Sequence, residues 1–274
     1  MSHDPYQPHH HHRHHHKHNP HHHSPQPYYQ PDNNSNAESL RLELVTTCVG
    51  FDDILDITLA ANHAHADNYI VVTTHADTKT QAVARKHSAT CVLTDLFFKN
   101  GRKFNKGAAI NDGFSYFQYN GWRMHIDCDI MLPDSFRRVL FNHTHLEPHC
   151  IYGMDRLNII GRDNINKLIH SGARQHHHGL LLGETENDGK LGHRLVESLR
   201  GYLPLGFAQL YNYTTQKPYP YSLGNAAHDD MAFSGLWPRH CRRLLPSTIC
   251  YHLCVTPPIV GEHWDGNPRK QRFS

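Results

Sequence analysis

Four short apolar runs, separated by segments with helical spacing, most constrain what this chain can fold into. The runs cover residues 40–45, 69–73, 90–93 and 122–126. Apolar residues recur with helical spacing in residues 52–64, 77–86 and 105–118. The run 69–73 is apolar throughout, as in a parallel strand that is buried on both faces. Strands that alternate with helices predict an α/β domain with a Rossmann-like, mostly parallel sheet flanked by helices.

The pattern is weaker beyond Pro133. Short helices are predicted at residues 134–141 and 228–236, and strands at residues 149–154, 205–213 and 249–254. Residues 161–200 have no strong periodicity. We expect binding loops in this second half, because loops commonly carry functional residues.

The first 38 residues differ from the rest of the chain. They contain twelve histidines and almost no aliphatic side chains, so we expect this segment to be disordered. Dense imidazoles can bind zinc, nickel or copper loosely, and they gain positive charge below about pH 6.5. A low-complexity tail without a selected role is the alternative. The folded domain is expected to span residues 39–274.

Composition narrows the class of protein only in part. The net charge of +2 and the absence of a long basic run argue neither for nor against nucleic-acid binding. Seven cysteines without a C-x-x-C pair indicate buried, reduced thiols, as in a cytoplasmic protein. No apolar stretch approaches the roughly 20 residues that span a bilayer, so no membrane insertion is expected.

The sharpest chemical signal is the end of the run 122–126, which leads directly into Asp127-Cys128-Asp129. Ligands of open α/β sheets gather at the carboxyl ends of the strands. Carboxylates there favour a cation, and Mg²⁺ or Mn²⁺ takes oxygen ligands together with substrate phosphates. The alternative is helix capping by Asp129 or Asp134.

Four stretches of the chain resemble family 2-type glycosyltransferases with the GT-A fold. They are residues 45–47, 71–77, 105–113, which resembles the family's GKAxAxNxG helix, and 126–129. The resemblance covers roughly residues 41–140 and, more loosely, residues 205–265. Two departures stand out, since Thr46-Thr47 replaces the commoner Pro-Thr and Cys128 fills the middle of the D-x-D sequence.

The resemblance implies a metal-dependent enzyme that moves a sugar from a UDP- or GDP-sugar to an acceptor. Residues 39–133 would form the nucleotide-sugar half and residues 134–274 the acceptor half. The residues implied in donor binding are Thr46, Thr47, Asp77, Lys106, Asn111 and Asp127. Asp77 would meet the uracil or ribose, and Lys106 would add positive charge beside the phosphates. An exposed helix residue is the alternative for Lys106.

The same resemblance implies a metal site and a catalytic base. Asp129, Asp127 and His252 would hold Mn²⁺ or Mg²⁺, with His263 as the competitor of His252 for that place. A satisfied core histidine is the alternative for His252. Asp230 or Asp229 would take the acceptor's proton, Asp230 being preferred, and a single displacement would invert the anomeric centre. Capping of the helix that begins there is the alternative for both acids.

Two other functions remain open from the sequence. A sugar nucleotidyltransferase shares much of this fold, although the loop at residues 46–53 is acidic and glycine-poor. A non-enzymatic metal-binding protein would use the histidine tail and a degenerate domain. The histidine triplet at residues 176–178 could bind a metal or form an ordinary solvated loop. Four tyrosines could stack on a sugar or a base, or could simply pack within the fold: Tyr211, Tyr213, Tyr219 and Tyr221. The acceptor, whether a soluble glycan, a protein or a modified nucleic acid, is not specified.

Overall fold

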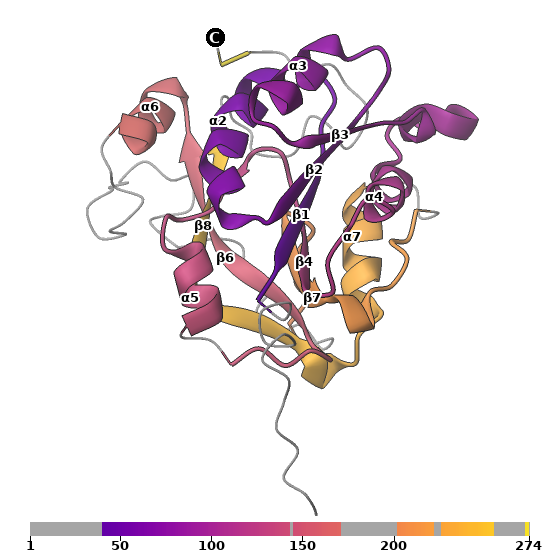
Figure 1. Cartoon of the computed structure of the whole chain (residues 1–274), viewed down its shortest axis with the longest axis vertical. Helices are drawn as coiled ribbons and strands as arrows, with labels where there is room; N and C mark the ends of the chain where they lie inside the picture. Colours follow the sequence, from indigo (N-terminus) through magenta and orange to yellow (C-terminus); the bar gives the residue numbers. More distant parts are fainter. Residues whose placement is uncertain (1–39, 143–144, 171–201, 222–225, 255–271, 274) are drawn as a thin grey trace, which may run out of the picture. The chain divides into compact units, whose positions relative to one another are not determined.

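A single mixed sheet organises the part of the chain that the structure describes. The structure is a computed structural model that describes residues 40–142, 145–170, 202–221, 226–254 and 272–273, all within the unit Asn33–Ser274. The order of strands in the sheet is β3-β2-β1-β4-β7-β6-β8-β5 (Figure 1). The strands are β1 (Leu42–Thr47), β2 (Asn68–Thr73), β3 (Thr90–Leu93), β4 (Trp122–Ile126), β5 (Ile130–Met131), β6 (Ile151–Ile160), β7 (Ala208–Asn212) and β8 (Arg242–Cys254).

Helices cover the sheet and connect its strands. They are α2 (Asp52–Asn62), α3 (Thr78–Lys86), α4 (Lys106–Phe114), α5 (Phe136–Asn142), α6 (Arg162–His170) and α7 (Ala226–Gly235). Short 3₁₀ turns lie at His63–His65, Leu96–Gly101, Tyr213–Thr215 and Arg239–Cys241. In Figure 1, α4 and α7 lie together on one side of the central strands, and α2 lies on the other.

The first half of the domain is a set of parallel βαβ units. Strand β2 pairs in parallel with β1 and β3, and β1 pairs in parallel with β4. Helix α4 approaches β1 and β2 closely at Gly113, where an added Cβ would lie 2.7 Å from Cγ2 of both Val45 and Val72. The α/β fold with a mostly parallel sheet is therefore confirmed, and the four predicted strands lie within two residues of their expected bounds.

The second half adds antiparallel strands to the same sheet. Strand β7 is antiparallel to both β4 and β6, whereas β8 is parallel to β6 and antiparallel to β5. Strands β6 and β8 therefore run in the same direction as β1 to β4.

Several predictions for this half were incomplete. The strand expected at residues 149–154 extends to Ile160, and the last strand begins at Arg242 rather than at residue 249. Helix α6 lies in a region where the sequence predicted no element, and the two-residue strand β5 was also missed.

A second apolar cluster explains the length of β6 and β8. Ile165 and Leu168 on α6 are fully buried against Leu157 of β6 and Tyr251 of β8. The far ends of these strands thus have a core of their own beside the main cluster under β1, β2 and β4. Tertiary burial, rather than local periodicity, stabilises this part of the fold.

Other expectations from the sequence concern the thiols, the membrane and the histidines. All seven cysteines are free, and all but the half-buried Cys91 are buried, as predicted. Among the helices of the described ranges, none combines the length and the apolar character that a bilayer crossing needs. The histidine-rich segment 1–38, the triplet 176–178 and His263 lie outside the described residues.

The side chain of Asn62, at the end of α2, hydrogen-bonds to the backbone at both ends of β5. Its Nδ2 donates to the carbonyl of Ile130 at 2.7 Å, and its Oδ1 accepts from the amide of Leu132 at 2.8 Å. Asn62 is fully buried, so these two backbone groups have no water to replace it. The segment that follows Asp127-Cys128-Asp129 is therefore fixed to α2.

We predict that Asn62→Ala lowers the free energy of unfolding by roughly 2–4 kcal/mol, because it leaves two buried backbone groups without a partner. Urea denaturation measures this loss. The matched control is His63→Ala at the adjacent, half-exposed position, for which we expect a change within about 0.5 kcal/mol. Equal stability of the two variants would contradict the role given to Asn62.

Candidate functional site

The D-x-D sequence forms a fixed turn between β4 and β5. The amide of Asp127 donates to the carbonyl of Phe207 at 3.0 Å, and the amide of Ile130 donates to the carbonyl of Asp127 at 3.1 Å. The hydroxyl of Thr58 on α2 donates to the carbonyl of Cys128 at 2.6 Å. The two acids are thus presented at the carboxyl end of β4, where the sequence predicted them.

Lys106 is the centre of the site. Its Nζ lies 2.7 Å from Oδ1 of Asp127 and 3.2 Å from Oδ2 of Asp230. The residue is only 3% exposed, and it begins α4, whose N-terminus is capped by the side chain of Asn105. One buried ammonium group therefore joins the end of β4 to α7.

The charges of this group shift one another's pKa values. Burial disfavours the charged form of Lys106, but the carboxylates of Asp127 and Asp230 outweigh it and raise the Lys106 pKa. Burial raises the pKa of Asp127 to about 6, with Lys106 opposing the rise and the neighbouring Asp230 and Asp129 adding to it. Burial, followed by the charge of Lys106, holds the pKa of His125 well below its ordinary value. His125 is therefore a neutral imidazole, with Nε2 3.7 Å from Oδ1 of Asp127.

Asp230 is held by a second set of buried donors. The hydroxyl of Tyr219 donates to Oδ1 of Asp230 and lies 3.0 Å from Oε1 of Gln209. Nε2 of the Gln209 side chain donates to the backbone carbonyl of Asp230 at 3.0 Å. Gly206 lies against the carboxylate, since an added Cβ would stand 1.8 Å from Cγ of Asp230. The orientation of this carboxylate is thus defined from three sides.

Asp129 faces His252 on the neighbouring strand. Oδ2 of Asp129 is 3.1 Å from Nε2 of His252, and Nδ1 of His252 is 3.1 Å from Oδ1 of Asn158. Burial alone would lower the pKa of His252, but Asp129, together with Cys254, raises it to about 10. A carboxylate and an imidazole whose outer nitrogen is held by a second residue fit the ligand set of a divalent metal.

The three predicted metal ligands do not all contact one another. The structure brings Asp129 and His252 together, whereas the carboxylate of Asp127 is directed to Lys106. Asp230 is also paired with Lys106. Asp229, the other predicted base, precedes it in α7 and is also buried.

The side chains of Asp77 and Asn111 are engaged within the fold. Asp77 caps α3 by accepting from the amide of Thr80 at 3.1 Å, and it also accepts from the amide of Gly50 at 2.7 Å. Asn111 pairs with the backbone of Tyr219, donating to its carbonyl at 2.8 Å and accepting from its amide at 2.7 Å. Asp77 thereby orders the loop after β1, and Asn111 places Tyr219.

Thr46 and Thr47 end β1 at the same edge of the sheet. Both are buried, and the hydroxyl of Thr46 has no hydrogen-bond partner within the described part of the chain. An unpaired buried hydroxyl is costly, which is consistent with a polar group of a ligand nearby.

Sequence reasoning missed four residues that build this site, His125, Asn158, Gly206 and Gln209, and gave Tyr219 a different role. Only His125 carried a signal, as a polar residue inside an apolar run. Tyr219 was considered for stacking on a ligand, but its ring is 1% exposed and stacks on Phe233 with centroids 4.3 Å apart. Its hydroxyl, not its ring, serves the site.

No known protein-family model matches the chain, and no curated protein sequence matches it. Glucosyl-3-phosphoglycerate synthase from Mycobacterium tuberculosis, solved with Mn²⁺, UDP and glucosyl-3-phosphoglycerate, is similar over 47% of this chain and 50% of that chain, with 13% identity and a TM-score of 0.35. Mannosyl-3-phosphoglycerate synthase from Rubrobacter xylanophilus is similar over 47% and 46%, with 17% identity and a TM-score of 0.37.

The Mycobacterium tuberculosis enzyme solved with phosphoglyceric acid is similar over 83% of this chain and 77% of that chain, with 11% identity and a TM-score of 0.45. The match with the first two structures spans about half the length of their chains. Identities and TM-scores at this level do not fix an activity for this chain.

We predict that Gly206→Ala lowers the free energy of unfolding by about 1–3 kcal/mol, because the new methyl group would overlap the carboxylate of Asp230. The matched control is Gly235→Ala at the end of α7, where an added Cβ meets nothing within 4 Å. Urea denaturation compares the two variants. A neutral Gly206→Ala would show that the Asp230 carboxylate is not confined as described.

A second prediction concerns the stability of the metal-free protein at alkaline pH. The pKa of His252 is about 10 in the folded protein, against about 6.5 for an ordinary histidine, so its contribution is complete below the lower value and is lost as the pH rises through the upper one. In the presence of a chelator, the free energy of unfolding should fall by up to ~1.4 kcal/mol per pH unit within this window. Urea denaturation at several pH values measures the slope.

The control for this experiment is His252→Gln, which should lack that part of the pH dependence. The remaining histidines are the same in both proteins, so the difference between the two slopes isolates His252. Identical slopes in the wild type and the variant would contradict the assignment.

Proposed function

We propose that this chain is a metal-dependent glycosyltransferase of the GT-A type, which moves a sugar from a UDP- or GDP-sugar to an acceptor with inversion. The observation that carries the proposal is the joint placement of Asp129 with His252 and of Lys106 with Asp127 and Asp230 at the carboxyl ends of the central strands. A cation site beside oriented carboxylates at this edge is what departure of a nucleoside diphosphate requires.

Asp129 and His252 would hold Mn²⁺ or Mg²⁺. The ion, when bound, supplies the positive charge that stabilises the departing diphosphate. Asn158 contributes by holding Nδ1 of His252, so that Nε2 faces Asp129. The proposal assigns the metal primarily to this pair, with Asp127 as the neighbouring acid whose carboxylate lies on Lys106.

Lys106 acts as a positioning residue for two carboxylates. Its Nζ makes ion pairs with both Asp127 and Asp230 and has almost no exposed surface. Without the ammonium group between them, these two neighbouring carboxylates would repel each other. It therefore serves the diphosphate indirectly, by setting the charge and geometry of the acids around it.

The nucleotide would lie over the loop that follows β1. Asp77 orders this loop through the amide of Gly50, and Thr46 and Thr47 bring hydroxyl groups to the same edge. We assign the nucleotide contacts to this edge because ligands of α/β sheets lie beyond the carboxyl ends of the strands.

Asp230 would act as the base. The acceptor oxygen would attack the anomeric carbon, the bond from that carbon to the diphosphate oxygen would break, and the acceptor's proton would pass to Asp230. A single displacement of this kind inverts the anomeric centre. Tyr219 and Lys106 each hold one oxygen of Asp230 in place. We prefer Asp230 to Asp229 as the base because it shares Lys106 with Asp127.

We predict that a UDP- or GDP-sugar with Mn²⁺ stabilises the protein, by about 2.7 kcal/mol at a hundredfold excess over its Kd. Thermal-shift measurement of nucleotide sugars with and without Mn²⁺ identifies the donor. The protein should then slowly release nucleoside diphosphate from it. Asp129→Asn should abolish the part of the binding that depends on Mn²⁺, whereas Asp230→Asn should keep binding and slow the release by about 10²–10⁴-fold.

The matched control is Asp95→Asn, which removes an exposed acid near the end of β3 and should change neither quantity. A metal-binding protein without enzymatic activity would respond to Mn²⁺ but not to any nucleotide sugar. A nucleotidyltransferase would form a nucleotide sugar from a nucleoside triphosphate and a sugar phosphate. Either result would overturn the proposal.

A further inference from the structure

A cluster of sulfur and nitrogen ligands lies at the edge of the sheet opposite the acidic site. Cys150 directly precedes β6, and Cys241 directly precedes β8. Strand β6 begins beside Tyr211 of β7, which pairs with Arg123 near the start of β4. Asp127, in contrast, follows the end of β4. The cluster and the acidic site are therefore separated by the length of a central strand.

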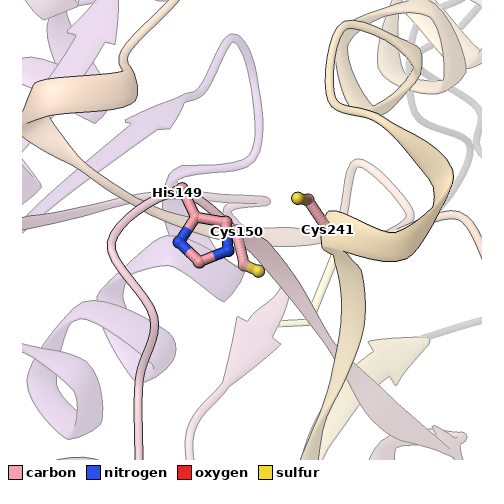
Figure 2. A group of neighbouring side chains, drawn as sticks. All are labelled: His149, Cys150 and Cys241. Carbon is pink, nitrogen blue, oxygen red and sulfur yellow. The ribbon is translucent and has the colours of Figure 1, made fainter. Parts of the chain in front are cut away.

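Strand pairing brings the two cysteines together. β6 and β8 are parallel, with Ile151 opposite Arg242, so the residues one position earlier, Cys150 and Cys241, stand side by side. Their sulfur atoms and a ring nitrogen of His149 all lie within 4.8 Å of one another (Figure 2). Both cysteines are buried, and His149 is exposed, so the cluster is reached from the surface.

A carboxylate lies beside two of these three ligands. Oε2 of Glu147 is 3.1 Å from Nε2 of His149 and 3.9 Å from Sγ of Cys150. Arg243 holds the same carboxylate from outside, with Nη2 donating to Oε2 at 3.0 Å and Nη1 donating to Oε1. Arg243 can keep Oε1 while Oε2 turns inward, which is how an outer residue orients a metal ligand.

We propose that Glu147, His149, Cys150 and Cys241 form a structural Zn²⁺ site. Zinc takes thiolate, imidazole and carboxylate ligands in a tetrahedron, and a site with four protein ligands is closed and structural. Zn–S bonds of about 2.3 Å place two sulfur ligands about 3.7 Å apart, so ligand atoms that already lie within 4.8 Å of one another need to close by at most about 1 Å. Because His149 is exposed, its ring can turn toward an ion held by the two sulfurs without moving the sheet.

The chemistry of these ligands separates this site from the acidic one. Mn²⁺ and Mg²⁺ prefer oxygen ligands, whereas two thiolates favour zinc. Bound zinc would fasten the segment before β6 to the 3₁₀ turn Arg239–Cys241 that leads into β8. The site thus stabilises the start of the pairing between β6 and β8, and it is independent of the proposed transferase activity.

The test uses the reduced, full-length protein with Co²⁺ as the probe. Thiolate ligands give a sulfur-to-cobalt charge-transfer absorption in the near ultraviolet, which the sulfur-free histidine tract cannot produce. We expect this band in the wild type, its loss in the double variant Cys150→Ser/Cys241→Ser, and at least a tenfold weaker zinc affinity in Glu147→Gln. Cys91→Ser and Asp129→Asn should keep the band, because neither residue belongs to the cluster.

A second measurement needs no variant, so it decides the question even if the double variant fails to fold. X-ray absorption of the wild type loaded with one equivalent of zinc should show two sulfur neighbours at about 2.3 Å. A zinc shell of nitrogen and oxygen alone would overturn the proposal. So would a charge-transfer band that survives in a folded double variant, or a Cys150–Cys241 disulfide in the reduced, zinc-treated protein.

Discussion

The buried ammonium group of Lys106 is the interaction on which the rest of the site depends. Taking a cation out of water costs several kcal/mol unless oppositely charged partners replace the water. Asp127 and Asp230 supply two carboxylates for this one charge, and together they keep Lys106 protonated. Lys106 is 124 residues away from Asp230 in the sequence, so this contact joins distant parts of the domain as well as the residues of the site.

Two glycines and one asparagine fix the geometry around that charge. An added Cβ at Gly107 would lie 2.1 Å from the carbonyl of Pro220, and one at Gly206 would overlap the carboxylate of Asp230. Asn111 holds the backbone of Tyr219, whose hydroxyl then reaches Asp230. Helix α4 therefore docks on segment 219–220 through its start and its middle. Asn111 lies in the stretch 105–113, which resembles a GKAxAxNxG helix, and its side chain takes part in this docking directly.

The sequence predicted the first half of the fold well because that half is local. Each of β1 to β4 is a short apolar run, and Asp77 marks the start of α3 by capping it. The turn at Asp127 could be predicted for the same reason, since an apolar strand leads straight into it. Parallel pairing then brings the ends of these strands to one edge.

The second half was predicted only in part, with α5, β7 and α7 near their expected places, because the rest of its stability comes from distant contacts. Strand β8 begins with Arg242 and Arg243, which resemble surface charges in the sequence, and it forms through its ladder with β6. Helix α6 has few apolar residues, and its burial of Ile165 and Leu168 appears only when β6 and β8 are in place. The partners of Asp230, and the neighbour of Cys150, likewise come from other parts of the chain.

The arrangement of charge at the acidic edge bears on the divalent ion that we propose for it. Lys106 and protonated His252 together face the carboxylates of Asp127, Asp129 and Asp230, so one negative charge remains in excess when all three acids are ionised. The pKa of Asp127, about 6, reflects this crowding after burial. An ion held by Asp129 and His252 must displace the proton of His252. The site would therefore exchange one proton for a divalent charge, which offsets the excess and brings these groups to neutrality before a diphosphate binds.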